Sequence, residues 1–258
     1  MRLGIAVCLF LLPYWLFSQV NTERYRRDYE TMGFVFTNTT GFNYETGNNE
    51  ELEINEAIRL DWNNPIQDYY AIIEYDFKTA SKVKTKDKGF IHLRTIRDFE
   101  KNYFFGEVFT QLEFDRFLNL RSRFLFGGGL RLDFISMFKD NDTAQNNVKL
   151  FAGVGLMYEN EVYSSEGTVY ISHLRSTNYL SLIMAITEDI DLGAVYYYQP
   201  ALVDFKDYRY TLDLRFRMKL SGKLSLLMTA RRKYRSMIVD ETDKNDFELK
   251  AAIVIRLP

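Results

Sequence analysis

The sequence predicts an all-β protein, an antiparallel up-and-down transmembrane β-barrel of about twelve strands with a charged lumen. Three observations predict it: segments that alternate apolar and charged residues, segments longer than most strands of soluble proteins, and an apolar segment at the start of the chain that has the features of an export signal. Residues 103–115 and 120–134 show the alternation most clearly.

In these two segments, apolar and charged side chains occupy opposite faces, because successive side chains of a strand point in opposite directions. Each segment has about a dozen residues, roughly twice the usual strand length and slightly more than the ~9–11 residues that cross a bilayer. The apolar faces hold Phe104, Val108, Leu112, Phe114, Leu120, Phe124, Phe126, Leu130, Leu132 and Phe134; the polar faces hold Glu107, Gln111, Glu113, Asp115, Arg121, Arg123, Arg131 and Asp133.

The first twenty residues have the order of parts of a signal peptide. Arg2 precedes an apolar run from Leu3 to Phe17, and polar residues follow it. We expect residues 1–19 to be removed and residues 20–258 to form a single outer-membrane barrel domain. The one cysteine, Cys8, lies in the removed part, so we expect no disulfide in the mature chain.

Composition adds two points. The net charge of −2 gives no reason to expect a nucleic-acid partner. The aromatic content of 16%, with 18 Tyr and 21 Phe, suits the aromatic belts of a barrel at the two membrane surfaces. No segment after the signal reaches the ~18 consecutive apolar residues of a membrane helix.

Taken in order, the mature chain begins with a polar lead-in at 21–31, and alternation then predicts twelve strands, an even number as in bacterial single-chain barrels. A Gly/Asn turn at 46–49 joins the first two, and Glu56 interrupts the apolar face of the second. The predicted strands are 33–45, 50–62, 66–79, 86–98, 102–115, 120–137, 146–162, 167–185, 189–199, 206–219, 222–235 and 246–257.

The strand at 206–219 fixes which face is outside. Tyr208, Leu212 and Leu214 alternate with charged residues such as Arg215 and Arg217. Because an arginine facing lipid near the midplane costs ~2–4 kcal/mol, the charges must line the lumen. With both termini periplasmic, the short turns at 63–65, 99–101, 186–188 and 220–221 fall on the periplasmic side and the longer links at 80–85, 200–205 and 236–245 fall outside; the link at 139–145 is long on the periplasmic side.

Several short motifs resemble a known family. They are Glu107-x-Phe109-x-Gln111, Leu120-Arg121-x-Arg123, Gly127-Gly128-Gly129-x-Arg131 and Gly153-x-Gly155-x-x-Tyr158-Glu159, with Gly33 and the turn Tyr44–Asn48 in the first hairpin. Together they resemble the salt-induced outer membrane protein family, a bacterial family without an assigned activity, over nearly the whole mature chain. The resemblance implies a barrel in the outer membrane and transfers no catalytic residue. The chain departs from outer-membrane barrels in ending on Leu257-Pro258 instead of an aromatic residue.

Catalytic and metal chemistry find little support in the sequence. His92 and His173 are the two histidines, and there is no G-x-S-x-G motif or pair of histidines at ligand spacing. Glu107, Glu113 and Asp115 could hold a hard cation, but lumen carboxylates facing arginines are usually ion-paired. We expect no catalytic residue, no metal and no cofactor.

The lumen charges divide by position in the chain. Because early and late strands stand on opposite sides of a closed barrel, we expect an acidic arc and a basic arc that either pair and close the lumen or hold a narrow channel open. The predicted acidic arc is Glu51, Glu53, Glu107, Glu113 and Asp115; the predicted basic arc is Arg209, Arg215, Arg217, Lys219 and Arg231.

Four glycines form a third predicted feature. If the hairpin turns about Asn141, Gly127 stands opposite Gly155 and Gly129 opposite Gly153. Such a patch would let the strands coil and let a long side chain lie flat against the backbone, or leave space for a ligand or water beside Arg131 and Glu159.

The sequence therefore predicts a non-catalytic outer-membrane barrel with a structural or permeability role and an ion-paired lumen. Its expected partners are outer-membrane lipid and the outer-membrane assembly machinery. Three alternatives stay open: a narrow channel, porin or ligand transporter; an outer-membrane hydrolase; and a soluble secreted barrel with the two faces reversed.

Overall fold

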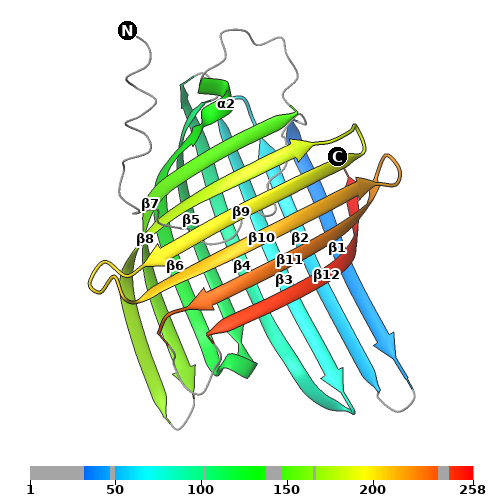
Figure 1. The fold of residues 1–258 in the computed structure, drawn as a ribbon, viewed down its shortest axis with the longest axis vertical. Helices are drawn as coiled ribbons and strands as arrows, with labels where there is room; N and C mark the ends of the chain where they lie inside the picture. Colours follow the sequence, from blue (N-terminus) through cyan, green and yellow to red (C-terminus); the bar gives the residue numbers. More distant parts are fainter. Residues whose placement is uncertain are drawn as a thin grey trace.

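The computed structural model describes residues 32–46, 50–100, 103–137, 147–164, 167–237 and 244–257; the predicted signal peptide and lead-in lie outside these ranges. Every strand pairs antiparallel with the next, and the last pairs with the first, so the described strands form a closed barrel (Figure 1). The elements are β1 Gly33–Glu45, β2 Glu51–Asn63, β3 Gln67–Ala80, β4 Val83–Glu100, β5 Phe104–Asp115, η2 Arg116–Leu118, β6 Leu120–Asp133, α2 Phe134–Met137, β7 Val148–Ser164, β8 Thr168–Ala185, β9 Ile190–Pro200, β10 Tyr208–Lys219, β11 Leu224–Arg235 and β12 Asn245–Leu257.

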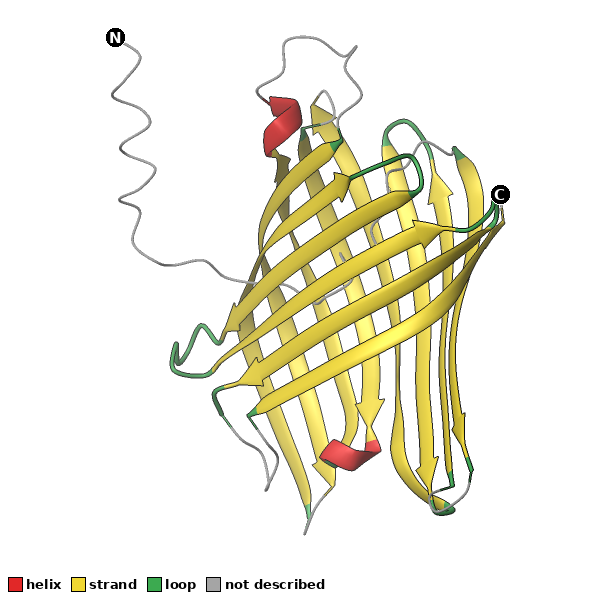
Figure 2. Cartoon of the chain, turned by 45° about the vertical axis from the view of Figure 1, so that its right-hand side comes forward, coloured by secondary structure: helices red, strands yellow, loops and turns green. Residues whose placement is uncertain are grey.

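The twelve-stranded antiparallel fold is as predicted. β1 begins and β12 ends at the same end of the barrel, which we call the terminal end; the other is the loop end. In Figures 1 and 2, strands β8 to β12 cross one wall obliquely in front of the steeper strands β1 to β6. Within the described part of the chain, no helix is long and apolar enough to cross a membrane.

Strand boundaries agree with the prediction within three residues, with one exception at β6. The strand was expected to reach residue 137 but ends at Asp133, whose carboxylate accepts hydrogen bonds from the backbone N–H groups of Ile135 (3.0 Å) and Ser136 (3.2 Å). This side chain caps the short helix α2, which replaces the last four residues of the predicted strand.

The expected longer link at 80–85 is also wrong. Ser81 and Lys82 alone connect β3 to β4, and both have positive φ, 50° and 65°. Two central residues with positive φ make the tight turn whose twist matches an antiparallel hairpin. β4 therefore starts at Val83, three residues earlier than predicted.

The outer wall is apolar and the lumen is charged. On β10, Leu214 is 47% exposed, while its lumen-facing neighbours Arg209 and Asp213 are 9% and 4% exposed. Exposed leucine, isoleucine, valine and phenylalanine side chains occur on every strand from β4 to β8. A soluble barrel with an apolar interior is therefore excluded, because the apolar side chains are on the wrong face for it.

Aromatic side chains gather toward both ends of the outer wall. Phe34, Trp62 and Tyr69 are exposed near the terminal end. Near the loop end, neighbouring tyrosine rings of β9, β10 and β11 lie 5.0–6.1 Å apart between centroids. One aromatic belt near each end of the strands is the arrangement that membrane barrels show at the two membrane surfaces.

The outward position of Leu214 gives a direct test. In lipid vesicles, Leu214→Arg is expected to lower the free energy of unfolding by ~2–4 kcal/mol, because it places a charge against lipid. Val203→Arg, in the exposed link between β9 and β10, is the matched control and should change stability by less than ~0.5 kcal/mol. Equal effects in a urea titration would mean that Leu214 does not face lipid.

Candidate functional site in the lumen

Two parts of the lumen differ in chemistry. A central layer combines aromatic and aliphatic side chains with a few buried polar groups, and a charged mouth lies at the loop end; further ion pairs, such as Arg59 with Asp61 and Arg215 with Asp191, lie toward the terminal end. The central layer contains Tyr70, Ile72, His92, Phe109, Phe151, Tyr179, Val195 and Tyr197, each 6% exposed or less.

On one side of the central layer three rings stack across β3, β4 and β5. Tyr70 and His92 lie 6.0 Å apart between ring centroids, and His92 and Phe109 lie 5.9 Å apart. The Nδ1 atom of His92 is 3.1 Å from Oε1 of Gln111. His92 is thus a packed wall residue, held by rings on both faces and by an amide at its edge.

The opposite side of the layer comes from β7, β8 and β9. Tyr179 packs against Tyr197 with ring centroids 5.5 Å apart, and Phe151 joins the same cluster. The Tyr179 hydroxyl is 3.5 Å from a carboxylate oxygen of Glu107 on β5, so the two sides of the layer meet across the lumen. Glu107 also pairs with Arg94 at 3.4 Å and with Arg131 at 3.9 Å.

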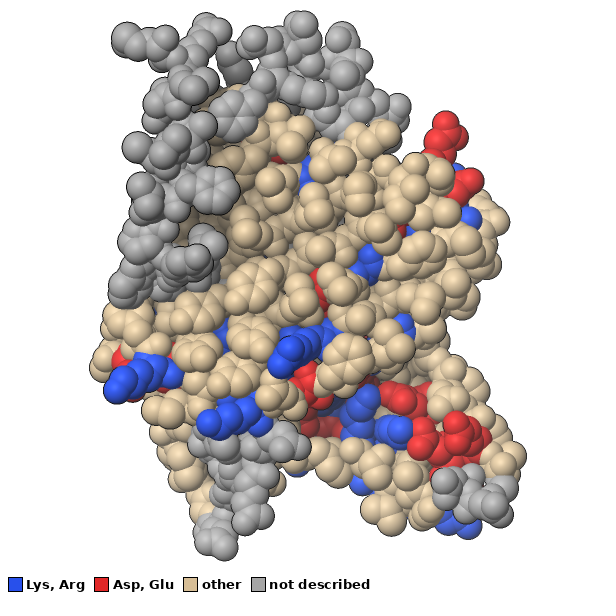
Figure 3. Space-filling model, in the orientation of Figure 1, with Lys and Arg blue, Asp and Glu red and all other residues tan. Residues whose placement is uncertain are grey.

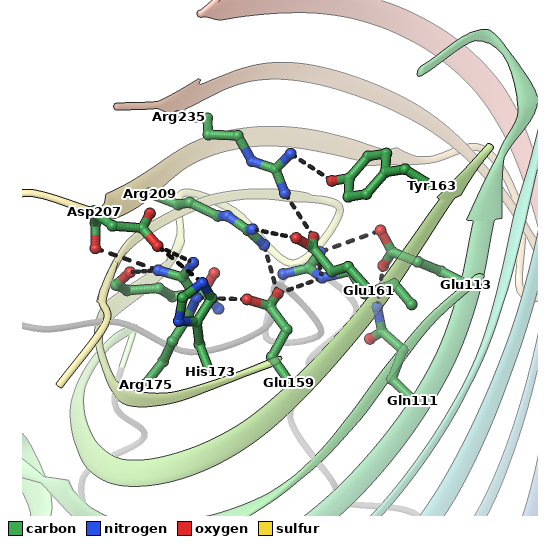
Figure 4. Close-up of polar contacts among 12 residues, drawn as sticks. Gln111, Glu113, Glu159, Glu161, Tyr163, His173, Arg175, Asp207, Arg209 and Arg235 are labelled. Atoms are coloured by element: carbon green, nitrogen blue, oxygen red, sulfur yellow. Dashed lines mark hydrogen bonds and ion pairs between the residues drawn. The ribbon is translucent and has the colours of Figure 1, made fainter. Parts of the chain in front are cut away.

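Two fully buried glutamates organise one side of the charged mouth (Figure 4). Glu159 accepts from Arg175 Nε and Arg209 Nη1, both at 2.5 Å, and from Arg123 Nε at 2.6 Å. Glu161 accepts from Arg209 Nη2 at 2.9 Å and from Arg235 Nη2 at 2.6 Å. These arginines come from β6, β8, β10 and β11, so the glutamate pair on β7 ties five strands together.

A second cluster lies on the other side of the mouth, and we call it the lysine cluster. It contains Lys86, Lys88, Lys250, Asp76 and Glu248. The shortest contact is Lys250 Nζ to Asp76 Oδ2 at 2.6 Å. Lys86 and Lys88 approach Glu248 at 3.3 and 3.5 Å.

The residues of the predicted acidic arc lie in strands β2 and β5, and each has its partner close by. Glu51 pairs with Lys78 at 2.6 Å, Glu53 with Lys86 at 2.7 Å and Glu113 with Arg123 at 3.2 Å; Glu107 contacts Arg94, as above. Asp115 instead caps η2 by accepting from the N–H groups of Phe117 and Leu118.

The residues of the predicted basic arc also pair with nearby acids, none of which belongs to the predicted acidic arc. Arg215 contacts Asp191 at 3.1 Å, Arg217 contacts the same carboxylate, Lys219 contacts Asp189 at 3.6 Å and Arg231 contacts Asp213 at 2.8 Å. Arg209 reaches Glu159 and Glu161. The prediction of two facing arcs is thus wrong: the bases of the basic arc pair with acids of β7, β9 and β10 and of the turn before β9, which the two predicted arcs left out.

The glycine register is also wrong by two residues. Gly129 stands opposite Gly155, Gly127 opposite Met157 and Gly153 opposite Arg131. The prediction assumed a turn centred on Asn141, whereas strand pairing stops at Asp133 and Phe151 and α2 follows.

The glycines leave no empty patch. A Cβ on Gly129 would lie 2.4 Å from the carbonyl oxygen of Val154, and a Cβ on Gly153 would lie 2.1 Å from the ring of Tyr179. The first contact shows close approach of two backbones, and the second shows a ring that rests on bare backbone. The glycines thus leave room for the central layer. The ring of Tyr179 occupies the space that was predicted to hold an arginine, a ligand or water.

His173, on β8, lies in the mouth with Nε2 3.6 Å from Asp207 Oδ2 (Figure 4). In the described ranges, no group of three or more His, Cys, Asp and Glu side chains is arranged to hold a metal ion.

A closed barrel with an apolar wall, two aromatic belts and a charged lumen defines the class of outer-membrane β-barrels. Residues 39–256 match the model of the family described as protein of unknown function, DUF481, and the chain belongs to this family. Curated protein sequences gave no match.

Solved structures that resemble the chain share little sequence with it. The translocator domain of the autotransporter NalP from Neisseria meningitidis is 10% identical with a TM-score of 0.50, over 86% of this chain and 87% of that one. An outer membrane channel from Pseudomonas putida F1 is 10% identical with a TM-score of 0.48, over 93% and 100% of the two chains. The NanC porin is 7% identical with a TM-score of 0.49, over 86% and 98%. At 10% identity the likeness to the NalP translocator domain concerns the fold alone.

We expect that removing the charge of Glu159 strongly lowers the free energy of unfolding. Glu159→Gln removes the negative charge shared by Arg123, Arg175 and Arg209, and loss of one member of a buried ion network typically costs ~3–5 kcal/mol. Glu188→Gln, in the exposed turn before β9, removes the same charge and should cost under ~0.5 kcal/mol. Urea unfolding in detergent measures both, and similar small losses would show that the network does not hold the wall.

Proposed function

We propose that this protein is an integral outer-membrane β-barrel whose lumen is closed at mid-height, with a structural role in the envelope and no catalytic activity. The observation that supports closure most strongly is the central layer. Ile72, His92, Phe109 and Tyr197 come from both sides of the lumen, and each is at most 1% exposed. Packed aromatic and aliphatic groups across a barrel leave no continuous path of water for ions.

Location in the outer membrane is part of the proposal. It is supported by the apolar outer wall, the aromatic belts and the signal-like start of the sequence, with lipid as the main partner. We place the terminal end in the periplasm and the loop end outside, and expect folding to need the outer-membrane assembly machinery. The motif resemblance further suggests kinship with the salt-induced outer membrane proteins.

The absence of catalysis is proposed from the surroundings of the two histidines. His92 is enclosed by two rings and an amide, which leaves no approach for a substrate. His173 faces Asp207, whose carboxylate is already engaged by Arg175 at 2.7 Å. Neither arrangement presents a base beside a serine nucleophile.

A narrow channel is the second candidate, and the charged mouth favours it. Side chains of the lysine cluster are 15–24% exposed except for Asp76, so water reaches the lumen from the loop end. Conduction would require the central layer to move aside. With the central layer in place, the mouth would bind a ligand without conducting ions.

Planar-bilayer recordings distinguish the two candidates. The wild-type barrel is expected to show no conductance steps, whereas Phe109→Ala with Tyr179→Ala removes two rings of the central layer and should produce them. Phe124→Ala with Leu174→Ala deletes outward side chains of similar size and should stay silent. Steady conductance of the wild type would contradict closure and favour the channel.

A further inference from the structure

The outer wall formed by β8 to β12 carries an apolar groove. Ala194 of β9 and Ala230 of β11 stand directly opposite Leu214 of β10, one on each side of it, and therefore share its outward face. Both alanine side chains are shorter than those around them, which leaves a groove of about 360 Å³. The larger side chains that border the groove are Leu182, Leu192, Leu214, Phe216, Met228 and Leu249.

Toward the loop end, the same outward face changes from aliphatic to aromatic. Tyr198 of β9 and Tyr234 of β11 stand directly opposite Tyr210 of β10, and Tyr196 and Tyr208 adjoin them. Neighbouring rings of these five residues, which we call the tyrosine platform, lie 5.0–6.1 Å apart between centroids. A continuous group of rings with hydroxyl groups suits a sugar, whose C–H face packs on aromatic rings and whose hydroxyls form hydrogen bonds.

An arginine stands on this face between the groove and the tyrosine platform. Arg232 is the next outward residue of β11 after Ala230 and is exposed, and its Cζ atom lies 6.0 Å from the ring centroid of Tyr210. Its Nη2 atom donates to the side-chain oxygen of Asn245 at 3.1 Å. Asn245 is uncharged, and within the described ranges no carboxylate forms an ion pair with Arg232. Figure 3 looks onto this wall, where a few blue side chains interrupt a largely uncharged surface.

The position of Arg232 favours an anionic partner at the membrane surface. An arginine on the lipid-facing wall is tolerated close to the membrane surface but not at the midplane, and the tyrosines beside Arg232 mark that surface. Its guanidinium presents several N–H donors in one plane, which match the oxygens of a phosphate. Lipid phosphates lie at this depth, so a lipid phosphate is the anion that Arg232 meets there.

The three features follow one another along β11 in the order of the parts of a lipid. Met228 and Ala230 line the groove, Arg232 comes next, and Tyr234 of the platform follows toward the loop end. An acyl chain in the groove would therefore place a phosphate beside Arg232 and the rest of the head group on the tyrosine platform. The small head group of a phospholipid would leave most of the platform uncovered, whereas the sugar of a glycolipid would cover it.

We propose that the outer wall of β9 to β11 is a binding site for a phosphorylated glycolipid in the leaflet at the loop end. An acyl chain lies in the groove, a phosphate pairs with Arg232, and a sugar ring packs on the tyrosine platform. This inference rests on the proposed function, whose membrane location and orientation it uses, and it identifies the lipid that the wall prefers. Because the site is on the outer wall, it does not depend on whether the lumen conducts.

Native mass spectrometry of the refolded barrel in uncharged detergent tests the phosphate contact. Lipid A, a phosphorylated and acylated disaccharide, should bind at least tenfold more tightly than the same lipid without its phosphates. Arg232→Gln should abolish this difference, and Arg232→Lys, which keeps the charge, should retain it. Arg97→Gln removes an exposed outward arginine near the terminal end of β4 and should leave the difference unchanged.

Filling the groove tests the place of the acyl chain. Ala194→Phe with Ala230→Phe puts two rings into the groove and should weaken lipid A binding at least fivefold. Ala71→Phe with Ala152→Phe makes the same change at outward alanines of β3 and β7 and should change binding less than twofold. Equal effects of the two double variants would show that the groove holds no part of the lipid and would overturn the site.

The choice between lipid A and phosphatidylglycerol, which has a phosphate but no sugar, tests the tyrosine platform. The wild type should bind lipid A at least fivefold more tightly. Tyr210→Leu with Tyr234→Leu should remove this preference, whereas Tyr210→Phe with Tyr234→Phe keeps the rings and should retain most of it. Tyr69→Leu, in the aromatic belt at the terminal end, should leave it unchanged.

Three results separate the possible failures. Equal binding of lipid A with and without its phosphates, or of lipid A and phosphatidylglycerol, by a correctly refolded barrel overturns the glycolipid site and leaves the proposed function intact. Failure of the wild type to insert into vesicles contradicts the proposed function itself. A stable dimer of the wild type that Ala194→Phe with Ala230→Phe separates would assign the groove to a second copy of the chain and overturn lipid binding there.

Discussion

The structure depends on one constraint: a strand in a bilayer must keep its charges away from lipid, so most of them point into one lumen. Once gathered there, they are removed from bulk water and must be paired, because an uncompensated buried charge costs several kcal/mol. The ion pairs of Glu159, Glu161, Asp191 and Asp213 follow from this. The same requirement explains why acids and bases lie close together in the lumen instead of forming two arcs.

Ion pairs between strands that are not neighbours also stiffen the wall. Arg209 of β10 reaches Glu159 and Glu161 of β7, and Arg235 of β11 joins them and donates to the Tyr163 hydroxyl at 2.6 Å. Contacts of this kind cross strands that share no backbone ladder. The lysine cluster does the same between β12 and strands β3 and β4, where the ladder between β1 and β12 is short. The lumen network therefore supports the barrel where backbone hydrogen bonds do not.

Much of the fold could be predicted from local sequence, because the two-residue period of a strand is local. The alternation of Tyr208 to Lys219 gave both the strand and its faces. Lumen partners could not be predicted in the same way, since Glu159 and Arg209 are fifty residues apart and meet only through the tilt of the closed barrel. The glycine register failed for a related reason: the carboxylate of Asp133 ends β6 and starts α2, which moved the pairing by two residues. The short ladder between β1 and β12 has no local signal, because it depends on how the first and last strands meet.

The central claim is that packed side chains exclude water from mid-lumen while the mouth stays wet. Thr177 lies on β8, two residues before Tyr179 of the central layer, and is 1% exposed, whereas Glu51 lies at the loop end. The most direct test is the reaction rate of Thr177→Cys and Glu51→Cys with a small, charged, membrane-impermeant thiol reagent in reconstituted vesicles. The account predicts rapid labelling of Glu51→Cys and none of Thr177→Cys over the same time; equal rates would show that water fills the lumen and would contradict it.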